Sequence, residues 1–199
     1  MLKLTQKNTT LIMFEQVLKS IQKFAEFSQK ERSLFTKKLK IKKVEKDDFL
    51  LRPGQVCNSI YFINCGAFRY YFRTNDFIER TLNLYIENDW VFDHQSFTSQ
   101  KPSFNYIQAF EPGEIFELDI YSLHELIERY NSFFKLGNLL VSVQDADFLL
   151  TEKSPDEKYK FILTNRPQLL HRFPLKYIAS YLRITPETLS RVRRKMIHR

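Results

Sequence analysis

The segment from Phe49 to Ile120 restricts the possible folds more than any other part of the sequence. It is a series of short aromatic and β-branched runs, and residues of these types favour strands. Three of the four glycines in the chain, Gly54, Gly66 and Gly113, lie at the turns between the runs. A β-rich domain is therefore predicted here. Its expected strands lie in SIYFI, AFRYYFRT, IERTLNLYI, NYIQAF and EIFELDI.

Helical patterns flank the β-rich segment on both sides. The first 46 residues are predicted to be helical, because apolar residues recur there at helical spacing. Two pairs, Ser28 with Glu31 and Ser122 with Glu125, have the spacing of a capping box that begins a helix. The apolar positions in the first helix are Leu11, Phe14, Leu18, Ile21 and Ala25.

A longer helix is predicted over residues 131–152, followed by a domain boundary near residues 151–154. Its apolar residues alternate between spacings of three and four, as in the seam of a coiled coil. The seam could pair two copies of the chain or pack on the β-rich domain, and the spacing leaves both interpretations open. Ser154 and Pro155 then favour the start of a new helix. The predicted seam consists of Leu136, Leu139, Val143, Ala146 and Leu150.

Charge divides the chain into three parts. Lys and Arg outnumber Asp and Glu by 12 to 4 in residues 1–46, giving +8, and by 12 to 4 in residues 151–199, again +8. Residues 47–150 carry 7 basic against 15 acidic side chains, giving −8. A basic C-terminal unit beside an acidic middle is expected when one part binds a polyanion, although a lysine-rich surface is often only solvated.

The sequence lacks the patterns of membrane, metal and enzyme sites. It has no apolar run of about 20 residues and no signal peptide, so a cytoplasmic protein without a membrane partner is expected. Cys57 and Cys65 lie in strand-like sequence and are predicted to be buried free thiols. No metal or cofactor is predicted, because the four histidines are scattered and no phosphate-binding or nucleophile motif occurs.

Two short helices joined by a three-residue turn are predicted near the C-terminus. Leu175, Ile178, Ala179 and Leu182 mark the apolar face of the first helix. The turn consists of residues 183–185. Thr185 is a suitable N-cap for the second helix, and Pro186 suits its first position.

The second helix of this pair has a polar face opposite its apolar stripe. Leu189, Val192 and Met196 form the stripe, which leaves the charged side chains together on the outside. This pattern predicts a helix-turn-helix that reads DNA bases and contacts phosphates. The alternative is a solvated terminal helix. The predicted DNA-binding residues are Thr185, Glu187, Thr188, Ser190, Arg191, Arg193, Arg194 and Lys195.

The run FPLKYIASYLRITPETLSRVRRK resembles the helix-turn-helix of the Crp/Fnr family of bacterial transcription regulators. In the Fnr branch the recognition helix begins E-x-x-S-R, and Glu187, Ser190 and Arg191 occupy these positions. FLLRPGQVCNSIYFINCGAFRYYF resembles the first strands of the family's cyclic-nucleotide-binding-like domain, and residues 131–152 match its dimerisation helix. The resemblance implies an α+β fold: N-terminal helices and a jelly-roll β-barrel in residues 1–130, a dimerisation helix in residues 131–152, and a small helix-turn-helix domain in residues 153–199.

The sequence departs from this family where cyclic AMP would bind. The resemblance places the effector pocket at Phe92, Asp93 and Ser103, in place of the glycine, glutamate and arginine of cyclic-AMP-binding members. A buried phosphate without its cation is costly, so cyclic AMP is not expected to be the ligand. Lys101 is the alternative cation. The effector is either an unidentified small molecule or none.

Arg183 is a second departure, because the family usually has glycine in this turn. A left-handed conformation at Arg183 is expected to cost on the order of 1 kcal/mol. Residues 168–173 are too few for a β-hairpin, so a DNA-contacting wing is predicted to be reduced or missing.

These observations together predict a homodimeric, sequence-specific transcription regulator that binds double-stranded DNA, with RNA polymerase as a further candidate partner. Two other functions remain as alternatives. The first is a protein-interaction module that has lost DNA binding. The second is a cupin-like enzyme, which would need clustered metal ligands that the predicted strands do not offer.

Overall fold

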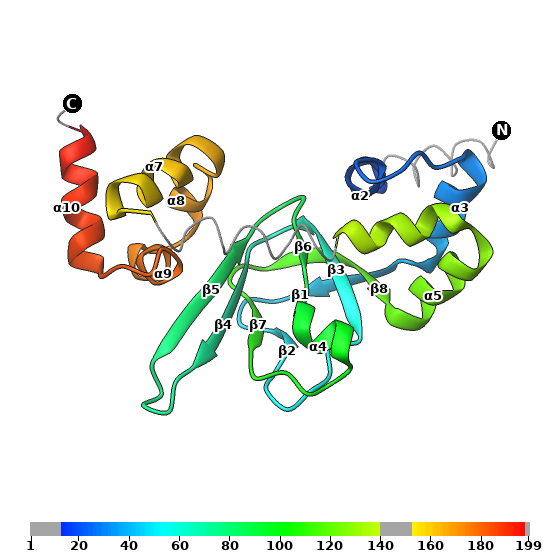
Figure 1. Cartoon of the computed structure of the whole chain (residues 1–199), viewed down its shortest axis with the longest axis horizontal. Helices are drawn as coiled ribbons and strands as arrows, with labels where there is room; N and C mark the ends of the chain where they lie inside the picture. The colour runs from blue at the N-terminus through cyan, green and yellow to red at the C-terminus, as the bar shows by residue number, and fades with distance from the viewer. Residues whose placement is uncertain (1–12, 140–152, 198–199) are drawn as a thin grey trace.

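Two four-stranded antiparallel sheets form the centre of the molecule in the computed structural model, which describes residues 13–139 and 153–197 (Figure 1). The predicted α+β fold with a jelly-roll domain is confirmed. The strands of the first sheet, in spatial order, are β1 (Lys40–Val44), β8 (Gly113–Asp119), β3 (Ser59–Cys65) and β6 (Trp90–Val91). Those of the second are β2 (Phe49–Leu51), β7 (Tyr106–Ala109), β4 (Phe68–Arg73) and β5 (Glu79–Tyr85).

The aromatic residues of the β-rich segment build its core. Phe62 on β3 lies opposite Phe116 on β8, and their ring centroids are 6.2 Å apart. Phe62 also packs against Trp90 in an edge-to-face arrangement, with ring centroids 5.3 Å apart. Rings packed at these distances contribute more than their buried area alone. Packing within the domain therefore accounts for these aromatic residues.

Three helices lie beside the first sheet, at the end of the molecule opposite the C-terminal helices (Figure 1). They are α2 (Glu15–Gln22), α3 (Gln29–Lys38) and α5 (Ile120–Arg129). The capping box of Ser28 and Glu31 at α3 is confirmed. The one predicted at Ser122 and Glu125 is wrong, because α5 begins earlier: the side chain of Asp119 is its N-cap and accepts a hydrogen bond from the backbone N–H of Ser122 at 2.8 Å.

The prediction of helix throughout the first 46 residues is wrong at its end, because β1 begins at Lys40. The pairs Lys40 with Glu117 and Val44 with Gly113 fix the antiparallel register of β1 on β8. Four of the five residues of β1 are exposed. An edge strand with so little buried surface lacks the apolar alternation by which strands are recognised.

The two cysteines lie in different environments. Cys57 is buried, as predicted, and burial raises the pKa of its thiol to about 11. Cys65 is exposed at the end of β3, so the prediction of a buried thiol is wrong there. Both are free thiols.

The predicted dimerisation helix is described only at its start. Residues Asn131–Leu136 form a 3₁₀ helix, and helical structure continues through residues 137–139. Leu136 and Leu139 are buried in the core of their own chain, with 3% and 4% of their surface exposed. The seam positions Val143, Ala146 and Leu150 lie outside the described residues, so pairing through this seam stays a prediction.

The described residues after 152 form helices only, and these pack around a second core (Figure 1). The capping box at Ser154 with Glu157 and the N-terminal proline are confirmed. Among the described residues, none of the helices has the length and apolarity needed to cross a membrane. The four helices are α7 (Pro155–Asn165), α8 (Leu169–Arg172), α9 (Leu175–Tyr181) and α10 (Pro186–Ile197); a further short helix beside the sheets is α4 (His94–Ser99).

Candidate nucleic-acid interface

Helices α9 and α10 form the predicted helix pair. Their connection includes Arg183, which has φ +56° and so adopts the left-handed conformation that its place in the turn predicted. The backbone N–H of Ile184 donates to the carbonyl of Ala179 at 3.0 Å, which closes the turn back onto α9. The strain expected at Arg183 is therefore present in the backbone.

The start of α10 is capped as the sequence predicts. The hydroxyl of Thr185 accepts a hydrogen bond from the backbone N–H of Thr188 at 3.2 Å. Leu189 is fully buried and Val192 is 5% exposed, so the apolar stripe faces the core of the C-terminal unit. This anchoring determines which face of α10 remains outside.

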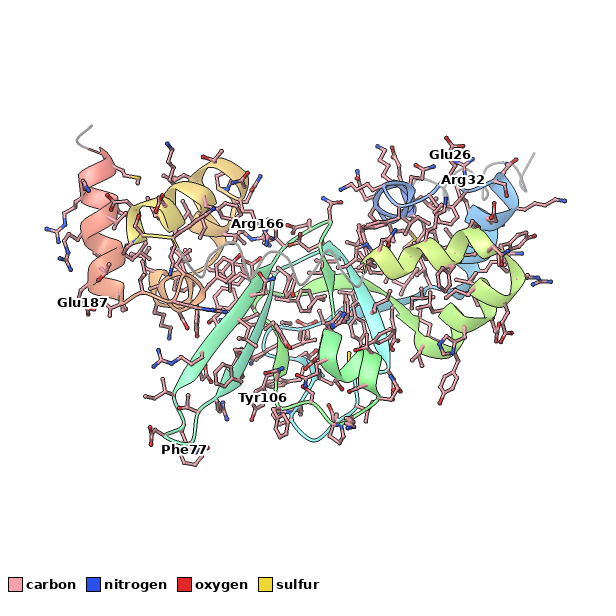
Figure 2. The ribbon with its side chains drawn as sticks, viewed as in Figure 1. Glu26, Arg32, Phe77, Tyr106, Arg166 and Glu187 are labelled. Atoms are coloured by element: carbon pink, nitrogen blue, oxygen red, sulfur yellow. The ribbon has the colours of Figure 1, made fainter. Side chains whose placement is uncertain are left out.

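The outward face of α10 carries most of the predicted DNA-binding residues. Glu187, Arg191 and Arg194 are exposed, and Figure 2 shows Glu187 near the start of the helix, on the side away from the sheets. Hydrogen bonds from its own backbone N–H and from the Thr185 hydroxyl hold the pKa of Glu187 below its ordinary value. Glu187 is therefore ionised at neutral pH and can accept hydrogen bonds only.

The remaining predicted positions differ in exposure and pairing. Thr185 is exposed, and Thr188, Ser190 and Arg193 are partly buried. Lys195 forms an ion pair with Asp156 at the start of α7. Because 53% of the Lys195 side chain is exposed, this pair is weak and the ammonium stays accessible.

The opposite side of the C-terminal unit is docked onto the second sheet. Arg172 at the end of α8 lies between Glu87 and Glu111, with Nε 3.0 Å from a Glu111 oxygen and Nη1 3.0 Å from Oε2 of Glu87. Arg166 pairs with Asp89 beside it. Two arginines of the basic segment thus neutralise carboxylates of the acidic middle of the chain.

Aromatic packing reinforces this docking. The Arg69 guanidinium lies between two rings, 4.1 Å from the centroid of Tyr71 on its own strand and 4.2 Å from that of Tyr177 on α9. Phe110 contacts Tyr177 with a centroid distance of 5.6 Å. The backbone N–H of Thr81 donates to the Ser180 hydroxyl at 2.9 Å. Helix α9 is therefore fixed on β5 while α10 projects away from the sheets (Figure 1).

The predicted effector-pocket residues form a closed hydrogen-bond network instead of an open site. Asp93 is 1% exposed and is the N-cap of α4, accepting from the backbone N–H of Ser96 at 3.0 Å. The hydroxyl of Ser103 donates to Asp93 Oδ2 at 2.5 Å, and Asn105 Nδ2 donates to the same oxygen at 2.9 Å. Ser103, which stands where the resemblance places the arginine of cyclic-AMP-binding members, thus donates a hydrogen bond to Asp93.

The pKa of Asp93 is consistent with a carboxylate whose oxygens are bonded by its neighbours. Burial alone would raise the pKa of Asp93, but the hydrogen bonds from Ser103, Ser96 and Asn105 leave it below its ordinary value. Phe92 is 1% exposed and packs edge-on to Phe97 at 5.8 Å. Lys101 is exposed, and its backbone carbonyl accepts a hydrogen bond from Ser96. No cation therefore faces Asp93 within the described network.

Residues 41–130 match the family model of the cyclic nucleotide-binding domain. No curated protein matches the sequence. The structure is similar to FixK2 from Bradyrhizobium japonicum, with TM-score 0.67 and 17% identity, covering 80% of this chain and 85% of that chain. It is also similar to a CooA mutant from Carboxydothermus hydrogenoformans, with TM-score 0.63 and 18% identity, covering 87% of this chain and 80% of that chain. A third similar structure is the Thermus thermophilus catabolite activator protein, with TM-score 0.55 and 20% identity, covering 88% of this chain and 86% of that chain. At these identities the likeness establishes the fold.

Sequence reasoning missed the docked side of the C-terminal unit. Arg166, Arg172 and Tyr177 carry no motif, and their partners are far away in the sequence. The opposite net charges of the middle and C-terminal segments were the one available signal. That signal shows complementarity but does not identify the residues that pair.

Proposed function

We propose that the chain is a homodimeric, sequence-specific DNA-binding transcription regulator of the Crp/Fnr type. The observation that carries this proposal is the α9–α10 pair, with its apolar stripe buried and Glu187, Arg191 and Arg194 exposed on one face. Arginine can bond guanine O6 and N7 together, and glutamate can accept from cytosine N4. In a dimer, two such helices about 34 Å apart would enter successive major grooves.

The cyclic nucleotide-binding domain would serve in this regulator without cyclic AMP. Asp93 has its oxygens occupied by donors from Ser96, Ser103 and Asn105. A cyclic phosphate brought to this place would break these bonds and find no arginine in exchange, which makes binding unfavourable. Micromolar binding of cyclic AMP in a calorimetric titration would contradict this part of the proposal.

Selection of bound sequences from random duplex DNA tests the proposal directly. We expect the wild-type chain to enrich a two-fold symmetric site. Arg191→Ala should lose about 1–3 kcal/mol of binding free energy and relax one base position in each half-site. Lys195→Ala should weaken binding to all sequences alike, because a phosphate contact carries no base information.

The control is Arg80→Ala, which removes an exposed charge on β5. It should leave both affinity and selectivity unchanged. The logarithm of the DNA-binding constant should also fall linearly with the logarithm of the salt concentration, and the slope should be proportional to the number of phosphates contacted. No enriched sequence, together with salt-independent retention on duplex DNA, would reject DNA binding and favour the protein-interaction module.

A further inference from the structure

A cavity of about 400 Å³ lies where four parts of the chain meet. One wall comes from the end of α2 and another from β5, β6 and the turn between them, while Leu139 and Arg166 at the end of α7 complete the lining. Figure 2 shows Arg166 between the C-terminal helices and the sheets. Small-molecule sites typically have volumes of roughly 300–1,000 Å³ and often lie at domain junctions. The size and place of the cavity therefore suit a small ligand.

The apolar wall of the cavity is held rigidly. Trp90 lines it, and its indole N–H donates to the Ser20 hydroxyl at 3.0 Å. That hydroxyl in turn donates to the carbonyl of Val17 at 2.7 Å, so the group that accepts from the indole is itself held in place. Tyr85 and Phe24 also line the cavity, so three aromatic side chains form its apolar part.

Unused hydrogen-bond donors also line the cavity. Lys23 is exposed, and no carboxylate of the described residues lies within ion-pair distance of it. Asn83 uses its carbonyl oxygen to accept from the backbone N–H of Leu84 at 2.8 Å, which leaves its amide N–H groups for another acceptor. Arg166 bonds Asp89 through Nη2, and a guanidinium has five N–H donors. Donors therefore outnumber acceptors on this lining.

We propose that this cavity binds a small organic anion that has a planar apolar part. Its carboxylate or phosphate bonds Lys23 and Arg166, and its apolar part stacks on Trp90. The anion then competes with Asp89 for Arg166, and so loosens a contact that docks the C-terminal unit. The binding site stands on the cavity alone, whereas the regulatory consequence rests on the proposed function.

Trp90 is the only tryptophan in the chain, so intrinsic fluorescence reports on this cavity directly. The probes are phenylacetate and phenyl phosphate, with phenylacetamide as the uncharged match of phenylacetate. We expect at least one of the two anions to change the fluorescence saturably, and phenylacetamide to bind at least about tenfold more weakly, since a charged hydrogen bond is lost. The two anions distinguish a carboxylate site from a phosphate site.

Single variants test the assigned contacts. Lys23→Gln should weaken anion binding several-fold, and the matched control Lys30→Gln, an exposed lysine on α3, should leave it unchanged. Asp89→Asn should tighten binding, because it removes the competing charge while keeping an oxygen to accept from Ile86 N–H. A thermal melt of each variant checks that it is folded.

Three results would overturn the proposal: no saturable response to either anion, equal binding of phenylacetamide, or equal effects of Lys23→Gln and Lys30→Gln. The titration contains no DNA, so its failure is distinct from failure of the DNA-selection experiment. Saturable anion binding by a chain that does not bind DNA would support the binding site but contradict its regulatory role.

Discussion

The two sides of the C-terminal unit use the same residue type for opposite purposes. On the docked side, Arg166 and Arg172 are held by carboxylates of the central β-rich domain. On the outward side, Arg191 and Arg194 are exposed on α10, with no carboxylate of the described residues within ion-pair distance. Net charge alone does not separate the two, because both sides contribute to the same excess of +8. The two sides differ in whether a carboxylate of the described residues lies within ion-pair distance of the arginines.

Substitution of one arginine on each side should give the largest difference between the two. Arg172→Ala should lower the free energy of unfolding by about 2 kcal/mol, because Glu87 and Glu111 lose their shared partner at a partly exposed site. Arg194→Ala should change it by less than about 0.5 kcal/mol, since the side chain is exposed. Chemical denaturation of both variants measures this. A loss for Arg172→Ala as small as that expected for Arg194→Ala would show that the Arg172 ion pairs do not stabilise the chain.

Acid should weaken the docked side before it affects the outward one. Burial alone would raise the pKa of Glu87, but hydrogen bonds from Arg172 and the Gly66 N–H leave it below its ordinary 4.5. A depressed folded-state pKa means that the stabilisation is present above about pH 4.5 and is lost as pH falls through the folded-state value.

The stability difference between wild type and Glu87→Gln should therefore be largest near neutral pH and shrink in acid. Denaturation curves at a series of pH values measure it. A difference that does not shrink at any acidic pH at which the chain stays folded would contradict the role of the Glu87 charge, because protonation removes that charge.

Relief of the left-handed strain at Arg183 tests the turn that joins the two sides. Arg183→Gly should raise the free energy of unfolding by up to about 1 kcal/mol, because glycine adopts φ +56° without the Cβ clash. Its melting temperature should rise accordingly. An unchanged or lower melting temperature would mean that the arginine side chain, or the extra freedom of glycine in the unfolded chain, outweighs the strain.

The ion pair between Lys195 and Asp156 should give the smallest effect. Asp156→Asn should change stability by less than about 0.5 kcal/mol, because both side chains are well exposed. The same variant should strengthen DNA binding slightly, since it frees the ammonium and removes a negative charge from the basic end of α10. A large loss of stability would show that the ion pair between Lys195 and Asp156 stabilises the fold, as the ion pairs of Arg166 and Arg172 are expected to do.

Local patterns predicted what local forces determine. The capping at Ser28, Ser154 and Thr185 and the buried stripe of α10 follow from side chains within one turn of one another. The aromatic runs predicted the β-rich domain, because strands with a buried face need such residues. The left-handed turn at Arg183 was also predicted, through the family resemblance.

Long-range contacts were beyond the reach of these patterns. The Asp93 network joins residues ten and twelve positions apart through polar side chains that carry no periodicity. The docking of α9 on β5 depends on surfaces that meet only after both units fold. Leu136 shows the same limit, because a coiled-coil spacing does not say whether a seam faces a second copy or the chain's own core.

Strand β1, which the sequence patterns predicted as helix, also protects the molecule. It lies at the outer edge of its sheet and bears Lys40, Lys42 and Lys43. An open edge would otherwise offer its backbone to strands of other molecules, and lysines along it make such pairing unfavourable. Replacing these lysines with strand-favouring apolar residues would make β1 easier to recognise and the protein more prone to aggregate.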